Sequence, residues 1–323
     1  MKTGKIKNAA GGDIELSRIV LGVGNYGFGR TPRDEAWKLM DYYYEQGGNT
    51  FDTGRVYVAW VKGGASQSEK NLGDWIRSRG VRGNVNVITK GGHPEWRNIH
   101  YSRLAPECIE YDIRTSLAVM QMETIDIYLL HRDDEKIPVG EIMDALHEHI
   151  EEGLCKSIGA SNWTLKRILA ANEYARKNNK TPFTSSSIQW TLADCRRQDL
   201  SDMTCVCMEP KEYEGYLAAE IPVISYTSQA NGFFTKLLER GEESIMGRTL
   251  AFLNDINRER AVKVREVCDR LECTPAALSV AFIEENELNG YAVIGSRTME
   301  QLRDSLSSDA VSLDQKTIDY LLS

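Results

Sequence analysis

The feature of this sequence that most constrains its fold is an alternation, repeated eight times, of short apolar runs with longer segments of helical periodicity. The short runs predict buried strands, and the longer segments predict amphipathic helices. The predicted strands lie at residues 18–21, 49–51, 85–89, 125–130, 157–160, 184–188, 223–225 and 291–294. Crossovers of this length join parallel strands, so the pattern predicts a closed (β/α)8 barrel, with an open parallel sheet as the competing arrangement.

The segment before the first predicted strand contains Gly11 and Gly12, and this pair predicts the turn of an N-terminal β-hairpin. No linker rich in proline, glycine or serine divides the chain. We therefore expect one barrel domain over residues 1–323, a length that α/β barrels commonly reach. Residues 194–209 and 229–246 lack clear periodicity, and we expect them to form long loops that cover a functional site.

Composition restricts the compartment and the partners. A net charge of −8 disfavours binding to nucleic acid or to anionic membranes. The chain has neither an apolar run of membrane-spanning length nor the apolar stretch of a signal peptide, so we expect a cytoplasmic location. Seven scattered cysteines fit a reducing compartment better than a disulfide framework. The Cys205-x-Cys207 pair near Cys195 matches zinc-ligand spacing poorly, and we expect no metal.

Polar residues stand at the carboxyl end of nearly every predicted strand, where the functional site of a parallel α/β barrel lies. They are Asp52, Lys90, His131, Ser161, Asn162, Gln189 and Tyr226, together with Ser296 and Arg297 of the segment Gly295-Ser296-Arg297. Each of them alone is more often a helix cap, a solvated charge or a structural side chain. Their joint placement at successive strand ends predicts one polar site at the mouth of the barrel.

The residues at this mouth favour proton donation. A tyrosine, with a pKa of about 10, keeps its proton at neutral pH and releases it reluctantly. We expect Lys90 to stabilise the phenolate of Tyr57 and lower its pKa, and Asp52 to hold Lys90 charged. His131 would then donate a hydrogen bond to a carbonyl oxygen. This set predicts general acid catalysis of carbonyl reduction.

Three motifs resemble the catalytic tetrad of the aldo-keto reductases: Phe51-Asp52-Thr53-x-x-x-Tyr57, Ile88-Thr89-Lys90 and Leu129-Leu130-His131. The resemblance covers nearly the whole chain. It implies a TIM barrel that reduces an aldehyde or ketone to an alcohol reversibly with NADPH, with Tyr57, Asp52, Lys90 and His131 as the catalytic residues. Members of this family differ in substrate, direction and oligomeric state, so these properties stay open.

The same resemblance implies a set of cofactor-binding residues. They are Gly24, Asn25, Tyr26, Asp52, Ser161, Asn162, Gln189 and Tyr226 around the nicotinamide, and Gly295, Ser296, Arg297 and Gln301 around the adenosine phosphate. The phosphate end also has a physical argument, because a helix starting near Thr298 would present backbone N–H groups to an anion. Arg297 would favour NADP over NAD, unless it pairs with Glu300 or Asp304. Ser305 stands where the family commonly has asparagine.

The segment after Asp52 departs from the family. Gly54 replaces the common alanine, and Val58-Ala59-Trp60 follows Tyr57 where glycine is common. A flat indole beside hydrogen-bond donors suits a sugar-derived or other polyhydroxy carbonyl. We therefore predict a substrate rim formed by Arg55, Trp60, His93 and Trp96. In the alternative interpretation Trp60 packs against its own loop and Arg55 is solvated.

Three rival interpretations remain. The Gly22-x-Gly24-x-x-Gly27 motif matches a dinucleotide-binding fingerprint, but the next helix is expected to begin only at Pro32, too late for a Rossmann fold. A protein of the same fold that senses NADP without useful turnover is a second possibility. A metal-dependent hydrolase is a third, disfavoured by a content of only five histidines.

Overall fold

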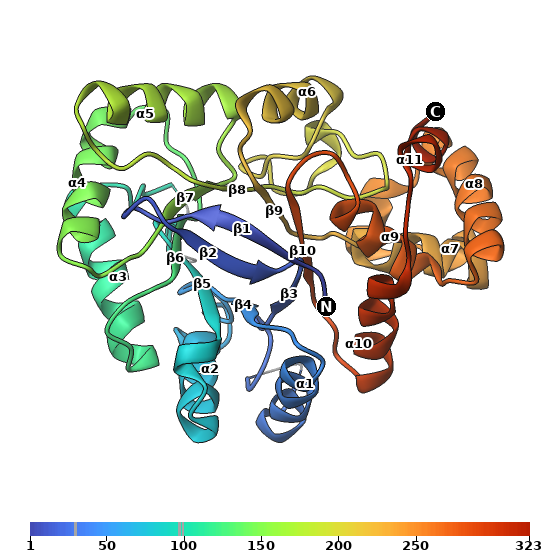
Figure 1. Ribbon diagram of the computed structural model, residues 1–323, viewed down its shortest axis with the longest axis horizontal. Coiled ribbons are helices and arrows are strands. Elements are labelled where there is room, and N and C mark those ends of the chain that lie inside the picture. Colours follow the sequence, from blue (N-terminus) through green and yellow to red (C-terminus); the bar gives the residue numbers. More distant parts are fainter. Residues whose placement is uncertain (29–30, 96–97, 99) are drawn as a thin grey trace.

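The computed structural model describes residues 1–28, 31–95, 98 and 100–323 (Figure 1). Its centre is a closed barrel with the strand order β10-β3-β4-β5-β6-β7-β8-β9, in which all neighbours pair in parallel. The strands are β3 (Ile19–Gly22), β4 (Thr50–Asp52), β5 (Asn86–Gly91), β6 (Ile127–Leu130), β7 (Ile158–Ser161), β8 (Ser186–Ser187), β9 (Val223–Ser225) and β10 (Gly290–Ile294). The predicted barrel is confirmed, and closure excludes both the open sheet and the Rossmann arrangement.

The predicted N-terminal hairpin is also confirmed. Strands β1 (Thr3–Lys7) and β2 (Asp13–Ser17) pair in antiparallel fashion, and Gly11 in the turn has a φ of +83°, which favours glycine. Figure 1 shows this hairpin lying across one end of the barrel. Ile6, Ile14 and Leu16 pack there with apolar side chains from the barrel interior, such as Ile127. The hairpin therefore closes the end of the barrel opposite the mouth.

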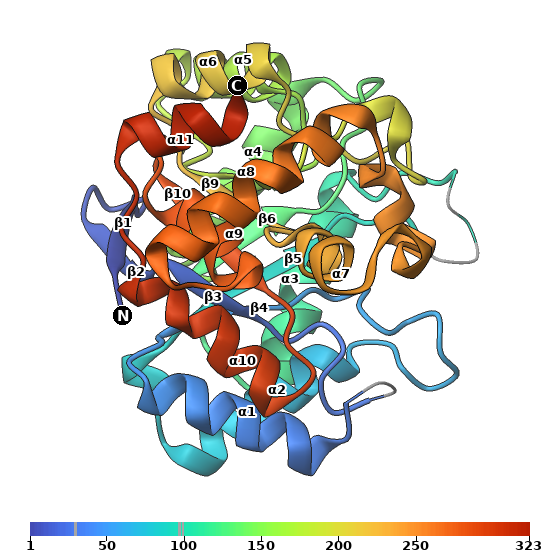
Figure 2. The same cartoon turned by 90° about the vertical axis from the view of Figure 1, so that its right-hand side faces the viewer.

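Helices surround the barrel, and their apolar faces pack against the outer faces of the strands. They are α1 (Arg33–Glu45), α2 (Gln67–Arg79), α3 (Pro106–Met120), α4 (Val139–Glu151), α5 (Leu165–Lys177), α6 (Pro210–Ala219), α7 (Phe233–Arg240), α8 (Asp255–Leu271), α9 (Pro275–Glu284), α10 (Met299–Leu306) and α11 (Gln315–Leu322). Figures 1 and 2 show α8, α9, α10 and α11 gathered on one side of the barrel. Within the described residues, no helix has both the length and the apolar character to cross a membrane.

The two expected loops contain more regular structure than the sequence indicates. Residues 229–246 include helix α7 and short 3-10 turns at Ala230–Gly232 and Glu242–Ser244. Residues 194–209, called the β8–α6 loop below, include a 3-10 turn at Arg197–Asp199. In this loop Cys207 forms a β-bridge with Gln189. Tertiary contacts with the strand ends, rather than local periodicity, order these segments.

Alternation along the strands directs polar side chains into the mouth. On β5, Ile88 faces the apolar barrel interior, and Thr89 faces outward to the α2 side chain Glu69. Lys90 therefore faces inward again, as the period of two requires. On β6, Leu129 faces the interior, and the same alternation turns His131 inward just after the strand. The strand period thus brings side chains from neighbouring strands together.

Candidate active site

Lys90 and Asp52 form a buried ion pair between the adjacent strands β5 and β4. Lys90 Nζ lies 2.5 Å from Asp52 Oδ2 and donates to the backbone oxygen of Thr53 at 3.0 Å. Burial raises the pKa of Asp52, and the ammonium of Lys90 opposes that rise. Burial acts to lower the pKa of Lys90, but Asp52 and Tyr57 outweigh it, so the pKa of Lys90 is raised. The lysine is therefore held as a cation.

Tyr57 lies in the turn after β4, next to this ion pair. Lys90 Nζ is 5.2 Å from the centre of the Tyr57 ring. Burial raises the pKa of Tyr57, whereas the charges of Lys90 and Arg132 act to lower it. Lys90 thus acts in the direction expected from the sequence, but the net shift is opposite to the expectation because desolvation of the phenolate is larger.

His131 lies on the other side of Tyr57. The two rings are 5.5 Å apart and nearly perpendicular, at 88°. Burial lowers the pKa of His131 well below its usual 6.5, and the charge of Arg132 acts in the same direction. His131 is therefore neutral at pH 7, and its Nδ1 makes no hydrogen bond with the described residues. The four side chains predicted as a proton-donating set thus lie together at the mouth.

Asn162 anchors a polar wall beside this set. Its backbone has a φ of +59°, and its side-chain oxygen accepts from the Tyr226 hydroxyl at 2.6 Å and from the Val206 backbone at 3.1 Å. Its side-chain nitrogen donates to the His131 backbone oxygen at 3.3 Å and to Ser161 Oγ at 3.1 Å. Asn162 therefore connects strand ends β6 and β7 with Tyr226 after β9.

Gln189 completes this wall after β8. Its backbone N–H donates to the Val206 oxygen at 2.9 Å, and its Nε2 donates to the sulfur of Cys195 at 3.1 Å. Both contacts are with the β8–α6 loop. The structure thus brings the predicted nicotinamide-binding residues Ser161, Asn162, Gln189 and Tyr226 together, and it adds a loop that contacts several of them.

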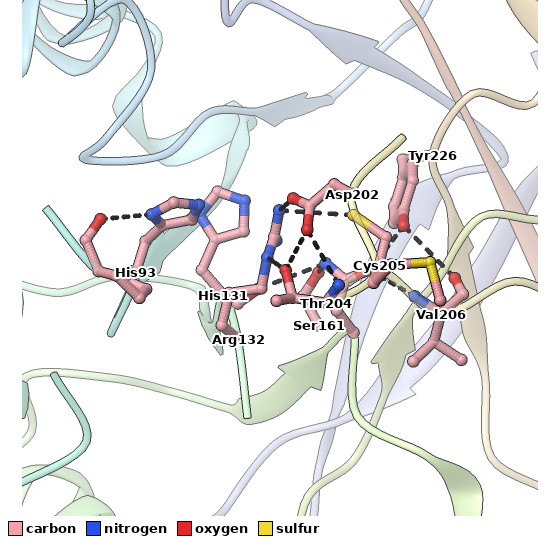
Figure 3. A network of polar contacts seen from close by, with 12 residues as sticks. His93, His131, Arg132, Ser161, Asp202, Thr204, Cys205, Val206 and Tyr226 are labelled. Carbon is pink, nitrogen blue, oxygen red and sulfur yellow. Dashed lines mark hydrogen bonds and ion pairs between the residues drawn. The ribbon is translucent and has the colours of Figure 1, made fainter. Parts of the chain in front are cut away.

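Arg132 is a site residue that sequence reasoning missed. Its guanidinium donates to Thr204 Oγ1 at 2.8 Å and pairs with Asp202 at 3.0 Å, which fixes the β8–α6 loop to the end of β6 (Figure 3). It also donates to the His131 backbone oxygen at 2.8 Å. The available signal was its position directly after His131, but the acidic partner lies 70 residues away along the chain.

The segment from Gly295 to Gln301 forms the other end of the site. Thr298 caps α10, and the Arg297 backbone N–H donates to Gln301 Oε1 at 2.9 Å. Ser296 is buried, and its hydroxyl has no hydrogen-bond partner among the described residues. A methyl group added to Gly295 would meet no atom within 4 Å. The segment therefore offers a buried donor and open space at a helix N-terminus.

Arg297 is exposed, and the ion pairs of the described residues include none between it and Glu300 or Asp304. Sequence reasoning also missed Lys236 on α7. Burial lowers the pKa of Lys236, and the nearby positive charge of Arg297 lowers it further. Gln229 reaches Ser305 Oγ at 2.9 Å, at the position where the family commonly has asparagine. One cation on α7 and one just before α10 thus lie near each other.

The β3–α1 connection lines the site between its two ends. Tyr26 is buried, and its hydroxyl donates to the Ser296 backbone oxygen at 2.6 Å. A methyl group on Gly24 would lie 2.9 Å from Tyr57 Cδ2, so the glycine lets the tyrosine ring approach the backbone. Asn25 is exposed beside them. Gly24 of the Gly22-x-Gly24-x-x-Gly27 motif therefore allows the Tyr57 ring to pack against the backbone. Helix α1 begins directly after Pro32, too late for a Rossmann fold.

The predicted substrate rim is only partly assembled. The His93 ring lies 4.9 Å from the His131 ring, and its Nδ1 lies 2.6 Å from the Pro94 backbone oxygen. Trp60 is 48% exposed. Arg55 instead pairs with buried Asp112 at 3.1 Å, and its guanidinium lies over an α3 tyrosine ring. Trp96 lies outside the described residues.

In the part of the chain that the structure describes, we find no group of three or more histidine, cysteine, aspartate or glutamate side chains that could hold a metal ion. Cys205 accepts a 3.5 Å contact from Arg132, and Cys207 donates to the Cys195 backbone oxygen at 3.3 Å. The cysteines of the β8–α6 loop are therefore engaged by protein groups.

Comparison with known proteins agrees with this arrangement. The sequence pattern of the aldo/keto reductase family matches residues 18–323. The chain is 27% identical to a norsolorinic acid reductase of Emericella nidulans, over 94% of this chain and 77% of that protein. It is 25% identical to an aryl-alcohol dehydrogenase (NADP+) of Phanerodontia chrysosporium, over 97% of this chain and 83% of that protein. It is 26% identical to an aldo-keto reductase of Emericella nidulans, over 95% of this chain and 78% of that protein. The chain belongs to the aldo/keto reductase family and is an oxidoreductase.

Proposed function

We propose that this protein reduces an aldehyde or ketone to an alcohol with NADPH, and that Tyr57 donates the proton. The observation that carries the proposal is the buried Lys90–Asp52 ion pair, at 2.5 Å, with the Tyr57 ring 5.2 Å from the ammonium. A buried cation next to a phenol lowers the cost of forming phenolate. Tyr57 is therefore the side chain best prepared to give a proton to a carbonyl oxygen.

His131 orients the substrate in this proposal. A neutral imidazole carries one N–H donor, and that donor can hydrogen-bond a carbonyl oxygen placed between His131 and Tyr57. The depressed pKa of His131 keeps it neutral, so the proton comes from Tyr57 and not from an imidazolium. Asp52 holds Lys90 in place, and general acid catalysis of this type contributes about 10² to 10⁴ in rate.

The residues that would hold the cofactor fit a phosphorylated dinucleotide. The unpartnered buried hydroxyl of Ser296 and the open space at Gly295 suit a phosphate oxygen at the start of α10. Arg297 and Lys236 supply positive charge there, which favours NADP over NAD. Ser161, Asn162, Gln189 and Tyr226 would hold the nicotinamide, with Gly24, Asn25, Tyr26, Asp52 and Gln301 lining the remainder. When bound, NADPH supplies the hydride.

An aryl carbonyl is the substrate class that we favour. Two relatives are named as an aryl-alcohol dehydrogenase and a norsolorinic acid reductase. A polyhydroxy substrate would need hydrogen-bond donors at the rim, but Arg55 is already engaged by Asp112. His93 and the exposed indole of Trp60 offer flat faces instead. The sugar-derived carbonyl predicted from the sequence is the second candidate.

Steady-state NADPH oxidation with aryl aldehydes, aryl ketones and sugar-derived aldehydes tests the proposal. We expect turnover of the aryl compounds, together with tighter binding of NADPH than of NADH in a fluorescence titration. Tight NADPH binding with no turnover of any carbonyl would instead identify a sensor, and turnover of the sugars alone would reject the aryl assignment.

All seven cysteines are free thiols, so we further propose a reducing compartment such as the cytoplasm.

A further inference from the structure

Two cysteines of the β8–α6 region flank the proposed nicotinamide residue Gln189. Gln189 Nε2 donates to Cys195 Sγ at 3.1 Å, and Gln189 forms a β-bridge with Cys207. The Cys207 thiol donates to the Cys195 backbone oxygen at 3.3 Å, so the two side chains are neighbours, and each shifts the pKa of the other. Both side chains are nearly buried, with 7% and 3% exposure. The proposed proton transfer uses neither thiol.

We propose that Cys195 and Cys207 are a redox-modification site: a peroxide converts the pair to a disulfide, and this disulfide weakens NADPH binding through Gln189. The inference rests on the proposed function, because it assigns regulation to the same site. The Cys207 sulfur lies 3.3 Å from the Cys195 backbone oxygen, so a local adjustment of the two segments brings the sulfur atoms to bonding distance.

The reaction balances in two steps. The Cys195 sulfur attacks a peroxide oxygen, and this step yields a sulfenic acid and one water from hydrogen peroxide. The Cys207 thiol then attacks the sulfenic sulfur, forms the S–S bond and releases a second water. Two thiols are thus oxidised by two electrons and one peroxide is reduced.

The environments of the two thiols support this order of attack. Hydrogen bonds from Cys207 and Gln189 lower the pKa of Cys195, with burial acting against them. The same contact with Cys195 raises the pKa of Cys207. The contacts agree, because Cys195 Sγ accepts a hydrogen bond from Gln189 whereas Cys207 Sγ donates its own proton to a backbone oxygen. Because the thiolate is the reactive form, Cys195 is the attacking residue and Cys207 the resolving one. Burial of both side chains makes the reaction slow.

The disulfide would act on cofactor binding from two directions. It converts the thiol sulfur that accepts from Gln189 Nε2 into a disulfide sulfur, and it removes the hydrogen bond from Cys207 to the Cys195 backbone oxygen. The local adjustment would also shift the neighbouring backbone of Val206, whose N–H donates to Asn162 and whose oxygen accepts from the Gln189 backbone. Loss of one net hydrogen bond between Gln189 and the carboxamide group of the nicotinamide corresponds to roughly fivefold weaker NADPH binding.

The experiment treats the full-length protein with hydrogen peroxide, maps disulfides by mass spectrometry and titrates NADPH fluorescence before and after dithiothreitol. We expect a Cys195–Cys207 disulfide, roughly fivefold weaker NADPH binding, and recovery on reduction. Cys195→Ser and Cys207→Ser should both keep their NADPH affinity in peroxide. Cys205→Ser should still form the disulfide and lose affinity.

A second thiol pair provides a matched control. Cys268 in the last turn of α8 accepts a backbone hydrogen bond from Cys273 at 3.1 Å, and each thiol shifts the pKa of the other. Neither residue takes part in a proposed cofactor contact in the described residues. Cys273→Ser should respond to peroxide as the wild type does. A pairing of Cys195 with Cys205, or a Cys195–Cys207 disulfide with unchanged NADPH affinity, overturns the inference. Failure of the reduced protein to bind NADPH would reject the proposed function instead.

Discussion

Gly24→Ala tests whether the position of the Tyr57 ring controls turnover. The added methyl group would lie 2.9 Å from Tyr57 Cδ2 and 3.2 Å from Cε2, whereas ordinary contacts begin near 3.4 Å. The ring must therefore move by about 0.5 Å. A misplacement of about 1 Å costs roughly a hundredfold in rate, so we expect kcat to fall about tenfold.

The assay is steady-state NADPH oxidation with an aryl aldehyde, together with thermal unfolding. The wild-type and Gly24→Ala melting temperatures should agree within about 4 °C, because the shifted ring lies at a partly open mouth. Gly83→Ala is the matched control, since its methyl group would meet no atom within 4 Å, and it should leave kcat unchanged. An unaltered kcat in Gly24→Ala would refute the claim that the ring position matters.

Three further changes probe other parts of the site. Arg297→Met should raise the NADPH dissociation constant about ten- to a hundredfold, as loss of a charge-assisted phosphate contact requires, and leave NADH binding unchanged in the same titration. Asp202→Asn removes the 3.0 Å ion pair with Arg132, so trypsin should cleave the β8–α6 loop up to about fivefold faster; an unchanged rate would show that the pair does not hold the loop. Burial raises the pKa of Glu69 to about 7, above the 4.5 of an unfolded chain, so its contribution to stability is lost as the pH rises through 7. Glu69→Gln should therefore melt higher than wild type at pH 8 but not at pH 4, and an equal difference at both pH values would contradict this assignment.

The sequence predicted the parts of the molecule that depend on local periodicity. The eight strands follow from the alternation of apolar runs with helical segments, and the hairpin follows from the Gly11-Gly12 turn. The placement of Asp52 and Lys90 at the ends of neighbouring strands follows from the same pattern. Strand bounds were less accurate: 184–188 was predicted, whereas β8 spans only Ser186–Ser187. Pairing with neighbouring strands, not local composition, decides where a strand ends.

The parts that the sequence did not predict depend on contacts between distant segments. Arg132 and Asp202 meet only because the β8–α6 loop folds back over β6. Arg55 looked available for substrate, but a buried carboxylate on α3 engages it. The net rise in the Tyr57 pKa reflects burial, which residue types alone do not reveal. Loop conformation and desolvation are therefore the two quantities that required the structure.

The central claim is that the Tyr57 hydroxyl supplies the proton, and Tyr57→Phe tests it most directly because it removes one oxygen atom and keeps the ring. The decisive measurement is kcat for an aryl aldehyde, taken beside the NADPH dissociation constant of the same preparation. We predict a loss of about 10² to 10⁴ in kcat with NADPH affinity within about twofold of wild type. A variant that retains wild-type turnover would show that another group donates the proton.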